Sequence, residues 1–218
     1  MQLPFTTEEF LNIFKSYNQS VFPLQILFII AALFCIYILF KNYKYKNKII
    51  NGLLSFLWLW IGIVYQLLFF SSINKGAYFF GIIFIIQGLL FLYYGVFKEE
   101  LQFKFKKSFL NYLGLFFFLY ALIIYPVLGH NLGHQYPYSP TFGLPCPTTI
   151  FTFGMLLFIN KKIKVALIIL PLIWSVIGFM AALNLFIYED FGLLVAGLLG
   201  FTLLIIKNKK DSDSLKTP

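Results

Sequence analysis

The stretch FGLLVAGLLGFTLLII (191–206), followed directly by KNKKDSDSLK (207–216), decides the fold class of this chain. The first part is an apolar run without a charged residue, and the second part holds four lysines. A helix needs about 20 mostly apolar residues to cross a bilayer, so such runs indicate membrane spans. Of the 218 residues, 60% are hydrophobic and only 11% are charged, which is too apolar for a soluble domain of this length. The sequence therefore predicts an all-α membrane protein.

Six further apolar segments precede this one, and we predict that the seven form one transmembrane domain over residues 21–206. Each segment is expected to be one helix of a polytopic bundle, because helices satisfy their own backbone hydrogen bonds in lipid. The seven segments are 21–40, 49–70, 77–97, 108–128, 147–159, 165–187 and 191–206.

The lysines predict the orientation of this bundle. Fifteen of the 17 lysines lie in four connections, 41–48, 98–107, 160–164 and the basic tail 207–218. The N-terminus and the alternate connections hold only Lys15 and Lys75. Lysine excess in short connections marks the cytoplasmic side of a membrane. We therefore expect the N-terminus outside and the C-terminal tail in the cytoplasm.

Residues 1–20 are predicted to form an amphipathic helix at the outer surface. Phe10, Phe14 and Tyr17 recur at helical spacing, and Thr6 or Thr7 is expected to cap the helix. Such a helix either lies on the membrane surface or packs on the bundle as a lid.

Sequence echoes suggest two parallel three-helix units joined by a linker helix, an arrangement known among transporters. The first and fifth segments begin at a proline, the second and sixth share Trp-x-x-x-Gly, and the third and seventh carry Phe-Gly. The residues concerned are Pro23 and Pro147, Trp58/Gly62 and Trp174/Gly178, and Phe80/Gly81 and Phe191/Gly192.

The fifth segment is short for a membrane span. Residues 147–160 give about 21 Å of helix, against a hydrocarbon core of about 30 Å. Either the bilayer is thinner there, or part of the preceding loop enters the membrane, where protein must enclose its irregular backbone. We favour a loop that descends partway.

The polar residues of the spans exclude several functions. No Asp, Glu, Lys or Arg lies within a predicted span, which argues against proton pumps, ion-coupled carriers and retinal pigments. There is no GxxxxGK phosphate loop, and the scattered lysines lack any nucleic-acid-binding signature. Four neutral amides remain, which either join helices or line a polar pocket open to the outside. They are Gln25, Gln66, Gln87 and Asn184.

Residues 129–146 carry both histidines and one of the two cysteines. His130 and His134 are four residues apart, Cys146 could add a thiolate, and Glu189 or Asp190 a carboxylate. This is not a recognised zinc spacing, and no cofactor is otherwise indicated. Alternatively, His134 acts as a base for a nucleophilic Cys146, or the segment is a proline-stiffened loop without chemistry of its own.

The block GHQYPYSPTFGLPCPTTIFTFG (133–154) resembles the signature of a bacterial family of small multi-pass membrane proteins known only as a domain of unknown function. Similar blocks are LPFTTEEF and YNQSVFPLQ within 3–25, WLWIGIVYQLLFFSSIN (58–74), FGIIFIIQG (80–88) and EDFGLLVAGLLG (189–200). The resemblance implies a polytopic inner-membrane protein and no established activity. The family-like positions of the central block are His134, Pro137, Pro140, Thr141, Phe142, Gly143, Pro145, Cys146 and Pro147.

Three functional hypotheses follow. The first is a carrier or binding protein for a small solute, with an outward-facing polar pocket. The second is a membrane-embedded enzyme that uses Cys146 and His134, with zinc or another transition metal as a further option there. The third is a structural or accessory subunit. The expected partners are the lipid bilayer and a small solute, with no nucleic acid, and a homo-oligomer is left open. The pocket residues are Gln66, Gln87, His134, Cys146 and Asn184.

Overall fold

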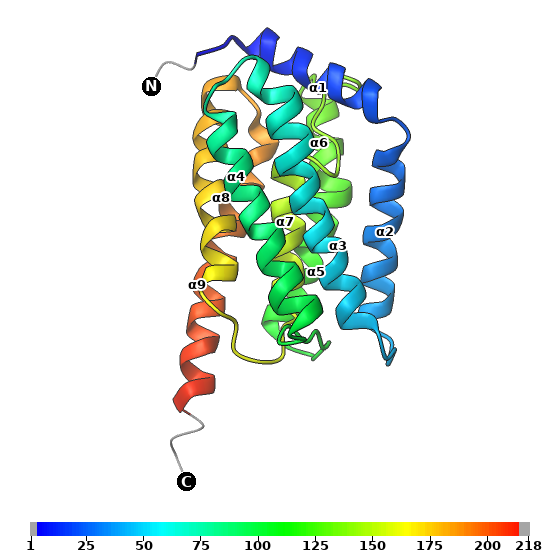
Figure 1. The fold of residues 1–218 in the computed structure, drawn as a ribbon, viewed down its shortest axis with the longest axis vertical. Coiled ribbons are helices and arrows are strands. Elements are labelled where there is room, and N and C mark those ends of the chain that lie inside the picture. Colours follow the sequence, from blue (N-terminus) through cyan, green and yellow to red (C-terminus); the bar gives the residue numbers. More distant parts are fainter. Residues whose placement is uncertain (1–3, 214–218) are drawn as a thin grey trace.

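The computed structural model describes residues 4–213, and every regular element in that range is helical. Three helices continue into π-helical stretches, and the others are α-helices or short 3-10 turns (Figure 1). The elements are α1 (Thr7–Val21), α2 (Leu24–Leu39), α3 (Lys46–Trp60), η1 (Ile61–Phe69), η2 (Phe70–Ser72), α4 (Ala77–Leu90), η3 (Phe91–Phe97), α5 (Phe109–Leu119), η4 (Tyr120–Ile124), α6 (Tyr125–Asn131), α7 (Pro145–Leu156), α8 (Ala166–Leu185), η5 (Tyr188–Asp190) and α9 (Phe191–Asp213).

Five helical stretches are long and apolar enough to cross a membrane. A sixth results if α1 and α2, which meet at a bend of 82°, count as one broken span. The prediction of an all-helical bundle is confirmed. By length and composition alone, five stretches qualify as spans, or six with the bent pair, and α7 has only 12 residues. The five stretches are Lys46–Ser72, Ala77–Phe97, Phe109–Asn131, Ala166–Leu185 and Tyr188–Ser212.

Helix α1 lies across one end of the bundle, as Figure 1 shows. Thr6 caps it as predicted, since its hydroxyl accepts from the Glu9 N–H while the Glu9 carboxylate accepts from the Thr6 N–H. The apolar stripe is buried against η1, where the Tyr17 ring meets Tyr65 edge to face. The Tyr17 hydroxyl also accepts a 2.8 Å hydrogen bond from Trp60 Nε1. Of the two arrangements considered for this helix, the structure has the one packed on the bundle.

Helix α7 occupies the centre of the bundle. Eleven of its 12 residues are buried, and it packs against α3, α5, α8 and α9. A Cβ on Gly114 of α5 would lie 2.8 Å from the Gly154 carbonyl oxygen, so these two helices approach at glycines, as expected for close packing. Helix α2, the equivalent of α7 in the suggested repeat, leaves several large apolar side chains exposed. The two triplets of helices therefore do not pack alike.

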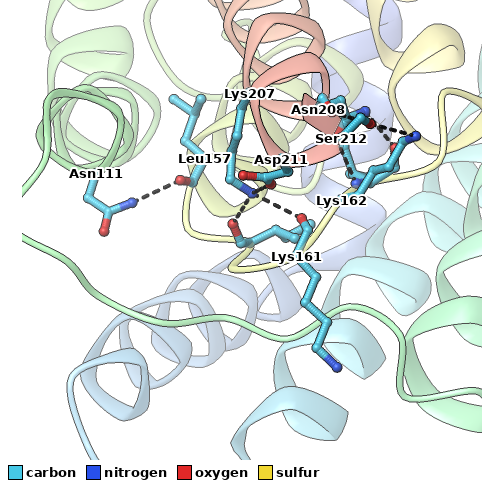
Figure 2. A network of polar contacts seen from close by, with 10 residues as sticks. Asn111, Leu157, Lys161, Lys162, Lys207, Asn208, Asp211 and Ser212 are labelled. Atoms are coloured by element: carbon cyan, nitrogen blue, oxygen red, sulfur yellow. Dashed lines mark hydrogen bonds and ion pairs between the residues drawn. The ribbon is translucent and has the colours of Figure 1, made fainter. Parts of the chain in front are cut away.

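The four lysine-rich segments meet at the end of the bundle opposite α1. The backbone pairs Lys104 N–H with Phe158 C=O over 2.9 Å, and Lys48 and Glu99 form an ion pair of 2.8 Å. The Lys207 ammonium donates to the carbonyls of Ile159 and Lys161 over 2.7 and 2.9 Å. Figure 2 shows Lys207 beside Lys161. Residues 207–213, expected to begin a separate tail, continue α9, because these contacts hold its last turns against the chain that follows α7.

Candidate functional site

Two adjacent carboxylates, Glu189 and Asp190, are buried at the junction of α8 and α9. Their exposed fractions are 1% and 4%. The sequence placed them in an outer connection, but the structure folds them into η5, which continues into α9 as the candidate span Tyr188–Ser212. Carboxylates removed from water need hydrogen-bond donors, so their partners define the site.

Asp190 accepts hydrogen bonds from two residues of other helices. The Tyr125 hydroxyl, at the start of α6, donates to Asp190 Oδ1 over 2.6 Å. The Cys146 thiol, in the first turn of α7, donates to the same carboxyl group. The thiol is partly buried and lies next to a carboxyl group. This environment is the opposite of the electropositive one that activates nucleophilic cysteines.

Glu189 is bound to His134, which lies outside the membrane-spanning segments. His134 Nδ1 and Glu189 Oε1 are 2.9 Å apart. The hydrogen bond to Glu189 raises the pKa of His134 above its ordinary value. A Cβ on Gly129 would lie 3.0 Å from Glu189 Oε1, so a glycine there lets the carboxylate approach the end of α6. Tyr120 donates to the Glu189 carbonyl over 2.8 Å and fixes the backbone.

Asp190 and Cys146 form the polar end of a cavity of about 560 Å³, which we name the α8 cavity. Its walls come from α1, η1, η2, α4, the starts of α6 and α7, and the C-terminal half of α8. It reaches the surface along α8, where Met180 is an exposed lining residue. Most of the lining is apolar, and includes Phe5, Phe14, Phe70, Ile177, Ala181 and Leu185.

Trp174 adds a hydrogen-bond donor to this polar end. The side chain is 8% exposed, and its ring packs edge to face on Phe84 with centroids 4.9 Å apart. The indole N–H points to the Cys146 sulfur, which is a weak acceptor, and it has no oxygen or nitrogen partner within residues 4–213. A Cβ on Gly178, another lining residue, would lie 3.4 Å from Trp174 Nε1, which places this nitrogen at the cavity wall.

His134 lines a second, smaller cavity of about 320 Å³, together with His130, Gln25 and Thr141. Tyr125 and Pro140 line both cavities and so separate them. Cys146 belongs to the α8 cavity, and His134 to the second one.

The loop before α7 is held by Asn18, a residue of α1. Its amide donates to the carbonyls of Pro137 and Ser139, both at 2.8 Å, and accepts from the Thr141 hydroxyl at 2.8 Å. Residues up to 139 are largely exposed, whereas the chain from Pro140 onward is buried on its way into α7. The loop thus enters the bundle partway along its length.

The structure separates the residues predicted for one pocket. Cys146 and Asn184 line the α8 cavity, although Asn184 is exposed and donates to the Met180 carbonyl. Gln87 is buried and donates to Leu167 O of α8 over 3.1 Å, which is a helix–helix contact. Gln66 is buried within η1 and lines neither cavity; both of its amide atoms lack a hydrogen-bond partner among the described residues.

His134 and Cys146 have different partners, so the structure does not assemble them as a base and a nucleophile. Within residues 4–213, no group of three or more His, Cys, Asp and Glu side chains is arranged to hold a metal ion. The site also contains residues that the sequence does not mark as site residues. Tyr125, Trp174 and Asn18 stand within apolar or helical patterns, so no local signal distinguishes them from core residues.

A protein-family model, described as a family of unknown function (DUF6064), matches residues 7–214 of the chain. No curated protein and no solved structure matches it.

Proposed function

We propose that this chain, which belongs to the DUF6064 family, is a polytopic protein of a bacterial cytoplasmic membrane that binds a small, weakly polar solute in the α8 cavity. It would act there as a binding protein or carrier. The single observation that carries this proposal is the cavity itself, a mostly apolar space of about 560 Å³ with hydrogen-bonding groups gathered at one end.

The outer surface of the bundle supports a location in lipid. Large apolar side chains are exposed along the helices, among them Leu68 at 68% and Phe97 at 70%. Exposed apolar area on this scale is unfavourable in water and typical of a surface that faces lipid.

The segments that lie at each end of the helical bundle support seven crossings with the N-terminus outside. α7 connects the α1 end, where Cys146 lies, to the lysine end, where the backbone of Phe158 pairs with Lys104. Its short length is tolerable because protein encloses it on all sides. Fifteen lysines in the connections at the other end favour the cytoplasm for that end.

The cavity suits a solute that is mainly apolar. Ligand sites of this size are commonly lined by hydrophobic and aromatic side chains, with few polar groups to fix the orientation of the ligand. Asp190, Tyr125 and Trp174 provide such groups here, and the opening along α8 gives access from the surface. A strongly polar solute would leave its own groups unpaired against the apolar walls.

Saturable binding of tritiated 1-decanol to the full chain in lipid nanodiscs tests this function, with empty nanodiscs subtracted. The variant Ala181→Phe fills the cavity with a ring and is expected to weaken binding by about tenfold or more. Leu183→Phe is the matched control, because Leu183 is exposed on the same helix and does not line the cavity. Absence of saturable binding, or equal binding by both variants and the original chain, would contradict the proposal.

A further inference from the structure

We infer that the polar end of the α8 cavity recognises an uncharged hydroxyl group at the end of an otherwise apolar ligand. The hydroxyl oxygen accepts from Trp174 Nε1, and its proton is donated to the carboxyl group of Asp190. This inference rests on the proposed function and specifies the chemistry of the ligand.

The indole N–H of Trp174 requires an acceptor. The residue is more than nine-tenths buried, and its nitrogen has no oxygen or nitrogen acceptor within residues 4–213; its one polar neighbour is the Cys146 sulfur, a weak acceptor. A buried donor without a strong acceptor is unfavourable, so a ligand oxygen placed there removes an existing penalty. The packing of the indole on Phe84 and Phe80 fixes its direction before any ligand binds.

The carboxyl group of Asp190 has room for a further donor. It accepts from Tyr125 and Cys146, whereas a carboxylate has about four acceptor positions. Within the described part of the chain, no cation forms an ion pair with it, because His134 is bound to Glu189 instead. Cys146 is hydrogen-bonded to Asp190 and lies beside Trp174, so the two groups belong to the same polar end of the cavity.

Only a head group that both donates and accepts satisfies this pair. An ether oxygen accepts from Trp174 but has no proton to donate to Asp190. A protonated amine donates to Asp190 but cannot accept from the indole, so Trp174 gains no acceptor. A carboxylate would add a third carboxyl group beside Asp190 and Glu189, and the repulsion between like charges is strong at low dielectric. The hydroxyl is the smallest uncharged group that meets both requirements.

Four probes of matched chain length separate these cases: 1-decanol, its isomer 1-methoxynonane, decylamine and decanoate. Their dissociation constants are measured by competition with tritiated 1-decanol on the full chain in nanodiscs. We expect 1-decanol to bind about tenfold more tightly than 1-methoxynonane, since the two differ by one donated hydrogen bond. Decylamine and decanoate are expected to bind more weakly than 1-decanol.

Two variants assign the two hydrogen bonds. Trp174→Phe removes the N–H and should weaken 1-decanol and 1-methoxynonane alike, so the ratio of their affinities stays the same. Asp190→Asn should bring the ratio close to one, because the amide can donate to the ether oxygen. Trp60→Phe and Glu99→Gln are the controls, since these residues lie outside the cavity and are bound to Tyr17 and Lys48.

The outcomes distinguish this inference from the function beneath it. Equal affinity for 1-decanol and 1-methoxynonane in the original chain, or tighter binding of decylamine, would overturn the hydroxyl inference while the cavity remained a binding site. Loss of saturable binding for all four probes would overturn the proposed function as well. The probe series uses the unaltered protein, so it stays decisive even if a variant fails to fold.

Discussion

Tyr125 and Asp190, 65 positions apart in the chain, are joined by a buried hydrogen bond of 2.6 Å from hydroxyl to Oδ1. This contact ties the start of α6 to the turn before α9 at the polar end of the α8 cavity. Tyr125 also lines both cavities and lies between them. It therefore has two roles, because its hydroxyl positions the Asp190 carboxyl group and its side chain separates the two cavities.

The first prediction concerns this hydrogen bond. Tyr125→Phe keeps the ring and removes the donor, and hydrogen bonds to charged groups contribute about 1.5–3 kcal/mol to stability. We expect a lower midpoint of thermal unfolding in detergent. Tyr112→Phe is the control, because Tyr112 is exposed and should lose little. Equal midpoints for Tyr125→Phe and the original chain would show that the contact does not contribute.

The second prediction concerns pH and the His134–Glu189 pair. The pKa of His134 is raised in the folded chain. The ion pair therefore adds its full contribution to the free energy of unfolding below the unfolded-state pKa of about 6.5. That contribution is lost as pH rises through the folded-state pKa. Replacing His134 by Gln should therefore lower the midpoint of thermal unfolding more at about pH 6 than at about pH 9.

His130→Gln provides the control for this measurement, since His130 lies nearby and is exposed. A difference between His134→Gln and the original chain that grows with rising pH would have the wrong sign for the proposed ion pair.

The third prediction concerns Asn18 and the loop before α7. Asn18→Ala removes three side-chain hydrogen bonds to this loop and should cost about 2–3 kcal/mol, because partly buried carbonyls lose their donors. Hydrogen exchange followed by mass spectrometry should show faster exchange within residues 133–141. Gln19→Ala, at an exposed neighbouring position of α1, should leave exchange there unchanged.

The fourth prediction concerns the orientation in the membrane. A reporter that is active only in the cytoplasm should work when inserted within 98–107 or fused after Pro218, and fail when inserted within 133–138. The physical reason is the group of fifteen lysines in 41–48, 98–107, 160–164 and 207–218, because lysine excess keeps such segments on the cytoplasmic side. Activity at 133–138, or inactivity after Pro218, would reject the proposed seven crossings with the N-terminus outside.

Much of the fold could be predicted because its signals are local. Apolar runs and lysine-rich connections mark the helices and their ends, and the Thr6–Glu9 capping box marks the start of α1. The place of α7 could not be predicted in this way. Its sequence shows a short apolar segment, whereas only the packing of α3, α5, α8 and α9 around it explains why it is enclosed.

Less of the site could be predicted, because a buried site depends on which faces of the helices meet. Cys146 was expected at a cavity and lines one. Gln66 and Gln87 are predicted to share that cavity, but neither side chain lines it. Gln87 donates to a backbone carbonyl of α8 instead. Asp190 was considered only as a metal ligand, since nothing in the sequence places it beside Tyr125 and Trp174.

The central claim is that a small, weakly polar molecule occupies the α8 cavity beside Cys146. The most direct test is the rate of Cys146 modification by N-ethylmaleimide, followed by mass spectrometry, with and without 1-decanol at about ten times its dissociation constant. Cys35, buried in α2 away from the cavity, is the internal control. We predict that 1-decanol slows modification of Cys146 by about tenfold, as mass action at that occupancy requires, and leaves Cys35 unaffected. An unchanged rate at Cys146, or an equal change at both cysteines, would contradict the account.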